Sequence, residues 1–317
     1  MKRFLFLVAP ILCILLSSCV GKAPPPLSQS STHISPPATS DTVPPTTTTT
    51  LTTVGGTLNV TTTQPVAPDG FSLTTEQISM LDNLISSYDG TLSVAYYDIT
   101  SGYQYSYNGA HKFPAASIIK APFCRYVLGM AEQNELDLSM GITYTEEMYV
   151  GGTGTIKDDE FGTTYTQLEL IKRVIRQSDN IAFKILRQIY PSAGFKQYAK
   201  AIGIADISGI KNINSSNIDA ADAITYMKDI YAYITGDNQY GKTLETHMLN
   251  TINPMICSKY PIIRKYGWMQ GAYHDMAIIK APRPYILVIL SDHSGGSDKD
   301  TEMFRVISKT IESVSGN

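Results

Sequence analysis

The chain has 317 residues, of which 43% are hydrophobic and 17% are charged, and its formal net charge is −3. This composition is typical of a globular protein, and the length suffices for one large domain or two interleaved ones. Because the charge balance is mildly acidic, we expect no nucleic-acid partner.

Residues 1–18 are expected to be an export signal. Lys2 and Arg3 form a short positive region, and Phe4 to Leu16 form an apolar stretch too short to cross a bilayer comfortably as a mature helix. The ending Leu16-Ser-Ser-Cys19 resembles a bacterial lipobox, in which the cysteine is acylated and becomes the new N-terminus. An ordinary secretory signal with an incidental cysteine is the alternative. In the first case we expect an exported protein held at the outer side of the bacterial cell membrane by lipid on Cys19.

A segment rich in Pro, Thr and Ser occupies residues 19–70, with an unbroken run from Thr46 to Thr50. Such a segment cannot bury enough apolar area to offset the entropy of ordering it. We expect a disordered tether between the lipid and the body of the protein. A glycosylated stalk is the open alternative.

The body opens with a predicted helix and two predicted strands. Thr74 and Gln77 fit a capping box at the start of the helix. The strands are expected at Leu92–Ile99 and Tyr103–Tyr107. From residue 128 to residue 255 the apolar residues recur at helical spacing.

Strand patterns return near the C-terminus, at Ile262–Met269, Asp275–Lys280 and Tyr285–Ser291, before a final helix at Thr301–Val314. Strands at both ends of the chain predict an α/β fold (an α+β sandwich), with one antiparallel sheet built from both ends, flanking helices and an inserted all-helical domain. The sheet subdomain is assigned to residues 71–127 and 256–317. The all-helical subdomain is assigned to residues 128–255.

The stretch Ser117-Ile-Ile-Lys120 stands where these two subdomains are expected to meet. Residues three apart on a helix are neighbours, so the Ser117 hydroxyl and the Lys120 amine can share one small site. A lysine desolvated by apolar neighbours has a lowered pKa and can act as the base that a serine nucleophile needs. The same spacing occurs at Ser208-Gly-Ile-Lys211, so spacing alone does not identify the nucleophile.

Two further motifs favour Ser117. Ser178-Asp-Asn180 lies between two predicted helices and supplies a hydroxyl that can relay a proton and an amide that can bind a substrate carbonyl. Lys265-Tyr-Gly267 lies on a predicted strand, where a cation and an open backbone edge can hold an anionic, peptide-like substrate.

With S-x-x-K, S-D-N and K-x-G in this order, residues 74 to 314 resemble a class A β-lactamase, of the penicillin-recognising superfamily of serine enzymes. The resemblance implies that Ser117 is the acylated nucleophile, Lys120 its proton acceptor, Ser178 a proton shuttle and Lys265 part of an anion site. It implies that the backbone N–H groups of Ser117 and Trp268 form the oxyanion hole. The substrate-binding residues would be Asn180, Tyr266, Gly267 and Trp268.

The sequence departs from that family in two places. Class A enzymes hydrolyse the acyl-enzyme with a glutamate on a loop after S-D-N, and no glutamate occurs here between Leu170 and Leu244. Asp206 is the only carboxylate between Ile181 and Asn217, and it fits a loop or cap role better than a catalytic one. Tyr266 stands where the family has a small Thr or Ser against the substrate carboxylate, so the fit of a β-lactam is open.

We therefore expect a serine hydrolase that is acylated at Ser117 by β-lactams or by cell-wall-derived amides or esters and that releases the acyl group slowly. A non-catalytic lipoprotein that binds or senses penicillin or peptidoglycan is the alternative. We expect a monomer with a small-molecule substrate, no metal or other cofactor, and membrane contact through the lipid only. Cys124 and Cys257 could pair, and a buried free thiol at Cys124 is the alternative.

Overall fold

The computed structural model describes residues 51–53, 56–58, 70–133, 135–204 and 216–317. The predicted signal peptide, Cys19 and most of the predicted tether lie outside these residues, as do Asp206 and the second S-x-x-K motif at residues 208–211. Within the predicted tether, β1 (Leu51–Thr53) and β2 (Gly56–Leu58) pair antiparallel. Residues 51–53, 56–58 and 70 are the part of the predicted tether that the structure describes, so its expected disorder stays a prediction.

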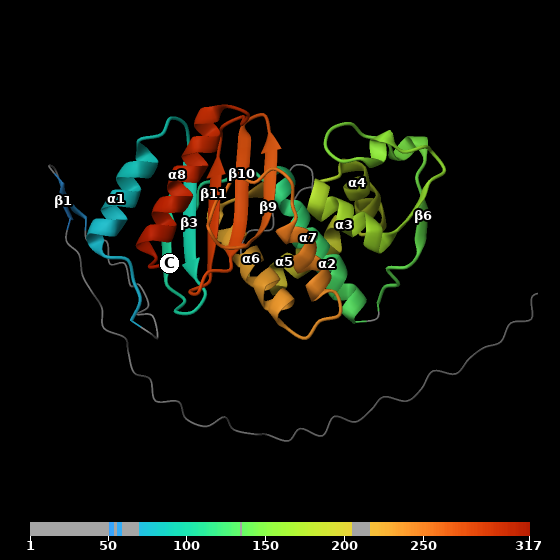
Figure 1. Cartoon of the computed structure of the whole chain (residues 1–317), viewed down its shortest axis with the longest axis horizontal. Helices are drawn as coiled ribbons and strands as arrows, with labels where there is room; N and C mark the ends of the chain where they lie inside the picture. Colours follow the sequence, from blue (N-terminus) through green and yellow to red (C-terminus); the bar gives the residue numbers. More distant parts are fainter. Residues whose placement is uncertain (1–50, 54–55, 59–69, 134, 205–215) are drawn as a thin grey trace, which may run out of the picture. The chain divides into compact units, whose positions relative to one another are not determined.

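A five-stranded sheet forms the centre of the body, in the order β4-β3-β11-β10-β9 (Figure 1). Its strands are β3 (Leu92–Asp98), β4 (Gln104–Tyr107), β9 (Ile262–Met269), β10 (Ala272–Ile279) and β11 (Tyr285–Ser291). All neighbouring strands are antiparallel, and β3 pairs with β11 so that Ala95 lies opposite Val288. The prediction of one antiparallel sheet built from both chain ends is therefore confirmed.

The strands β10 and β11 are buried along their whole length, which explains their nearly continuous apolar sequences. Alternate side chains of β11 enter different cores. Ile286, Val288 and Leu290 join the core of the helical segment, whereas Leu287 and Ile289 join the core beneath the terminal helices. Each buried side chain of this size contributes about 1.5–3 kcal/mol. β9 lies at the edge of the sheet, so one side of its backbone is open to a neighbouring element or a ligand.

Two helices from opposite ends of the chain cover one face of the sheet, namely α1 (Thr75–Ser86) and α8 (Asp298–Val314) (Figure 1). The predicted capping box of α1 is present. Gln77 N–H donates to Thr74 Oγ1 at 3.2 Å, and Thr74 N–H donates to Gln77 Oε1 at 2.8 Å. The final helix begins earlier than predicted because the Ser297 hydroxyl caps it.

The other face of the sheet carries the helical segment, and α6 packs directly against β3, β10 and β11 (Figure 1). The helices share one apolar core. They are α2 (Lys120–Glu132), α3 (Gln167–Gln177), α4 (Asn180–Ile189), α5 (Ser192–Ala201), α6 (Ala220–Thr235) and α7 (Gly241–Leu249).

Short strands and single turns accompany these helices. β5 (Phe113–Pro114) pairs with β8 (Asn217–Ile218), and β6 (Gly141–Thr143) pairs with β7 (Thr164–Thr166). The 3-10 turns are η1 (Ala116–Ile119), η2 (Glu146–Met148) and η3 (Ile156–Asp158). The sequence did not indicate these pieces, because two or three residues are too few to show a period.

The described residues group into one compact unit, so the division into a sheet subdomain and a helical subdomain stays a prediction. Cys124 and Cys257 are both free thiols, and Cys124 is buried in the helical core, as the alternative to a disulfide expected. In the part of the chain that the structure describes, no helix combines the length and the apolar character that crossing a membrane requires.

Candidate active site

The chain reaches Ser117 through β5, which is held by a buried histidine. Ser117 lies in η1, a single turn that continues into α2. His274 Nε2 lies 2.9 Å from the Pro114 carbonyl oxygen, and the Ser291 N–H donates to His274 Nδ1 at 3.1 Å. Burial lowers the pKa of His274 to about 4, so the neutral ring accepts at Nδ1 and donates at Nε2. These two hydrogen bonds fix the segment that precedes Ser117.

The backbone around Ser117 is strained and closely packed. Ala116 has a φ of +46°, a left-handed conformation that costs a residue with a side chain about 1–2 kcal/mol. Gly267 on β9 passes so close that a Cβ there would lie 3.0 Å from Ser117 N and 2.9 Å from Ile118 N. Only glycine allows this approach, which brings the edge of β9 against the start of η1.

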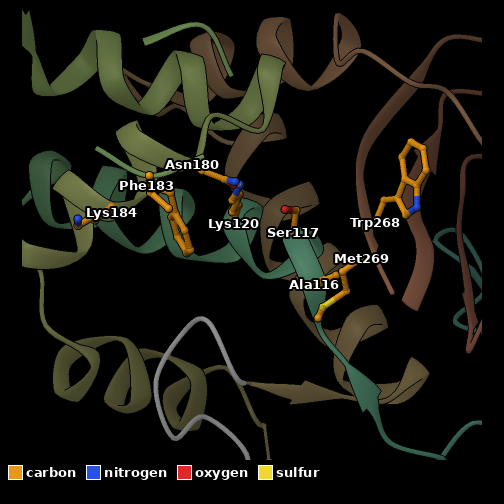
Figure 2. Close-up of a pocket in the computed structure, with 9 residues that line it drawn as sticks. Ala116, Ser117, Lys120, Asn180, Phe183, Lys184, Trp268 and Met269 are labelled. Carbon is orange, nitrogen blue, oxygen red and sulfur yellow. The ribbon is translucent and has the colours of Figure 1, made fainter. Parts of the chain in front are cut away.

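Lys120 is 3% exposed and donates hydrogen bonds to three oxygen atoms. They are Ser178 O at 2.6 Å, Ser178 Oγ at 3.2 Å and Asn180 Oδ1 at 2.7 Å. Burial lowers the pKa of Lys120 to about 7, although the nearby Asp179 opposes this shift. Figure 2 shows the Ser117 hydroxyl pointing toward Lys120. At neutral pH a large fraction of Lys120 is therefore uncharged and able to accept a proton.

Ser178 lies between two lysines. Lys265 Nζ donates to Ser178 Oγ at 3.0 Å and to the Tyr266 carbonyl at 2.9 Å. Lys265 is fully buried, and this burial together with the neighbouring Lys120 holds its pKa well below the ordinary value. Ser178 ends α3 with a φ of +57°, a strained conformation that directs it into this position. The hydroxyl can exchange a proton with either amine.

Asp179, the middle residue of the S-D-N motif, fixes the motif in place. It is 1% exposed. Its Oδ1 accepts from the N–H groups of Ile181 and Ala182 at 2.9 Å each and so caps α4. Its Oδ2 accepts from the N–H groups of Thr155 and Ile156 at 2.8 and 3.0 Å. Four backbone donors on one carboxylate tie α4 to the loop before η3 and hold both neighbours of Asp179 in the site.

Two adjoining cavities of about 340 Å³ each form the cleft, and both reach Ser117, Asn180, Trp268 and Met269. Lys120 lines the first cavity, and Ser178 and Tyr266 line the second. Figure 2 shows Ser117 with Lys120 and Asn180 on one side and Trp268 and Met269 on the other. Of the predicted site residues, Lys265 and Gly267 lie behind the cleft wall, where they contact Ser178 and the Ser117 backbone.

Five residues that line the first cavity were missed by the sequence analysis: Ala116, Val150, Phe183, Lys184 and Met269. Ala116 directly precedes Ser117. Phe183 and Lys184 follow Asn180 by three and four positions, so a predicted helix after S-D-N could have placed them on the same face. Met269 follows Trp268 directly. Val150 lies in a loop and gave no signal.

The sequence model of the beta-lactamase enzyme family matches residues 77–314. Solved structures with the same fold include PBP-A, with 19% identity over 76% of this chain and 98% of that chain and a TM-score of 0.67. A beta-lactamase from Sphaerobacter thermophilus has 15% identity over 77% and 98% of the two chains, with a TM-score of 0.68. One from Chitinophaga pinensis has 19% identity over 76% and 100%, with a TM-score of 0.67. No curated protein matches the chain.

Proposed function

The chain belongs to the beta-lactamase enzyme family, and on that premise we propose that it is a serine hydrolase acylated at Ser117. The observation that carries this proposal is the state of the Lys120 amine. It is buried, its pKa is lowered to about 7, and the Ser117 hydroxyl points toward it (Figure 2). An amine with a pKa near the working pH is the base that a serine nucleophile requires.

In the proposed acylation, neutral Lys120 takes the proton of Ser117 Oγ while the oxygen attacks the carbonyl carbon of an amide or ester. The backbone N–H groups of Ser117 and Trp268 stabilise the oxyanion that forms. When the bond to the leaving nitrogen or oxygen breaks, Ser178 donates its proton to that atom. Ser178 then recovers a proton from Lys120, its hydrogen-bond partner at 3.2 Å. The acyl group remains on Ser117, and Lys120 is neutral again.

Release of the acyl group is proposed to be slow. Among the described residues that line the cleft, none carries a carboxylate. A positioned general base contributes a factor of about 10²–10⁴ in rate. Without one, the ester of Ser117 is expected to persist.

The proposed acyl donors are β-lactams or cell-wall-derived amides and esters. A mutant of the structural neighbour PBP-A has been solved as an acyl-enzyme complex with penicillin G. Penicillin G is therefore a suitable probe for this protein. Mixed with this compound, the protein is expected to gain the mass of one penicillin molecule and to lose it slowly. The Ser117→Ala variant is the control and should stay unmodified. If neither an adduct nor hydrolysed penicillin forms, the β-lactam part of the proposal is wrong.

A second candidate is a non-catalytic lipoprotein that binds penicillin or peptidoglycan. The buried Tyr266 beside the cleft and the lack of a carboxylate among the described cleft residues favour it. A panel of activated esters separates the two candidates. If the protein hydrolyses an ester and the Ser117→Ala variant does not, the second candidate function is wrong. A binding protein would hydrolyse no ester and would keep its ligand affinity in Ser117→Ala.

We also propose that the protein is exported and anchored in the bacterial cell membrane by lipid on Cys19. The positive, apolar and lipobox-like segments of residues 1–19 support this. The Cys19→Ser variant is expected to leave the membrane fraction and to lack the mass of the lipid. Membrane association that is unchanged in this variant would contradict the anchor.

A further inference from the structure

The two lysines of the site are almost fully buried, although Lys120 lines the first cavity. Lys120 is 3% exposed and Lys265 is 0% exposed. The three hydrogen bonds that Lys120 donates go to Ser178 and Asn180. Lys265 donates to Ser178 and to the Tyr266 carbonyl, and the Tyr266 ring lies 4.2 Å from Lys265 Nζ. The hydrogen bonds of both amines are therefore made to protein oxygen atoms rather than to groups in the cleft.

Tyr266 fills the space beside Ser178 and Lys265. It is 1% exposed, and it lines the second cavity together with Ser117 and Ser178. Its hydroxyl is buried and has no hydrogen-bond partner among the described residues. Burial raises its pKa, so the hydroxyl is a neutral group. A neutral phenol can accommodate an uncharged group of a ligand, but it cannot neutralise an anion.

The remaining wall of the first cavity is mostly apolar. Val150, Trp268 and Met269 are 38%, 50% and 46% exposed and border the same cavity. Lys184 is the other cation among the described lining residues, and its amine is bonded to the carbonyls of Glu147 and Tyr149 at 2.7 and 3.3 Å. Apolar side chains that stay exposed together at one cleft are suited to bind an apolar ligand group.

From these contacts we infer that the acyl donor is uncharged next to its scissile bond and carries an apolar acyl group. The inference rests on the proposed acylation at Ser117 and narrows its substrate class to neutral esters or amides. A carboxylate near the reacting carbonyl would lose its water against an apolar wall, and the amines of Lys120, Lys265 and Lys184 already donate to protein oxygen atoms, so its desolvation would be poorly compensated. An apolar acyl group would instead cover the Val150, Trp268 and Met269 side chains.

Penicillin G and its methyl ester provide a matched pair that shares one reactive ring and differs in the carboxylate. The rate of Ser117 acylation is measured by intact mass for each, and each rate is divided by the rate of alkaline hydrolysis of the same compound. We expect the normalised acylation rate of the methyl ester to be at least about tenfold higher than that of the free acid. A tenfold ratio corresponds to a free-energy difference of about 1.4 kcal/mol. A faster reaction with the free acid overturns the inference.

The Tyr266→Ser variant tests the cause of this preference, because a small residue opens the space beside Ser178 and Lys265. We expect the ratio of the two rates to fall toward one or to invert. Tyr285→Phe is the matched control, since Tyr285 is also a buried tyrosine without a hydrogen-bond partner among the described residues and does not line the cleft. It should keep the ratio of the unmodified protein. A ratio that is unchanged in Tyr266→Ser overturns the assignment to Tyr266.

p-Nitrophenyl phenylacetate, a neutral ester with an apolar acyl group, separates failure of this inference from failure of the proposed function. If this ester and both penicillins leave Ser117 unmodified, the proposed function is wrong, and the inference falls with it. If all three acylate Ser117 and the free acid is the fastest, the proposed function stands and only the inference is overturned.

Discussion

In the proposed acylation, Lys120 decides at which pH Ser117 can react, because only the uncharged amine can accept a proton. Burial lowers its pKa to about 7. Below this value the amine is mostly protonated, so the rate of acylation should fall about tenfold for each pH unit. Above it the rate should level off. Stopped-flow or quenched mass measurements of acylation from about pH 5.5 to about pH 9 test this. A rate that is flat across this range, or that falls as pH rises, would contradict the role of Lys120.

Ser178 has a hydroxyl that is expected to affect the acylation rate and a strained backbone that is expected to affect stability. Two substitutions separate these effects. Ser178→Ala and Ser178→Gly both remove the hydroxyl that lies between Lys120 and Lys265, so both should acylate about 10²-fold or more slowly. Glycine adopts the observed φ of +57° without strain. Ser178→Gly should therefore be about 1 kcal/mol more stable than Ser178→Ala in denaturant unfolding. If the two variants differ in acylation rate but not in stability, this interpretation is wrong.

The packing of β9 against η1 sets the geometry of the proposed oxyanion hole. A Cβ at position 267 would lie 2.9 Å from Ile118 N and 3.0 Å from Ser117 N, so one of the two elements must move. Loss of one oxyanion donor costs a factor of about 10²–10³. We expect Gly267→Ala to lower the acylation rate by at least that factor while the protein stays folded by circular dichroism.

Gly151→Ala is the matched control for this substitution. Gly151 lies in the loop beside Asn180, and nothing lies within 4 Å of a Cβ built there. Its carbonyl, which accepts from Asn180 Nδ2 at 3.0 Å, is kept in the variant. The control should acylate at the rate of the unmodified protein. Equal losses in the two glycine variants would show that close packing at β9 is not the cause.

Most of the elements that carry the site could be predicted from local pattern. β9 has the expected bounds, because the apolar strand pattern that decides them lies within its own sequence. β10 begins at Ala272 rather than at the expected Asp275. Gly271, with a φ of +70°, closes a tight turn that pairs Ala272 with Met269, and pairing rather than periodicity extends the strand. A cross-strand partner cannot be identified from a local window.

At the scale of the whole molecule, three segments far apart in the sequence supply the site: η1 with α2, the S-D-N loop, and the edge strand β9. The order of their motifs was enough to predict that Ser117, Ser178 and Lys265 lie together, and both site lysines do contact Ser178 Oγ. The sequence could not predict that both lysines are buried and that their amines donate hydrogen bonds to protein oxygen atoms. Burial depends on how the sheet, which both chain ends build, packs against the helical segment.

The central claim is that Ser117, and not the second S-x-x-K serine at position 208, becomes acylated. Trypsin cleaves after lysine, so the peptide of residues 113–120 contains Ser117 as its only hydroxyl side chain, and the peptide of residues 201–211 contains Ser208 as its only one. After reaction with penicillin G methyl ester, mass spectrometry of the digest should find the added mass on the peptide of residues 113–120. Added mass on the peptide of residues 201–211, or on neither peptide while other esters are hydrolysed, would contradict the account.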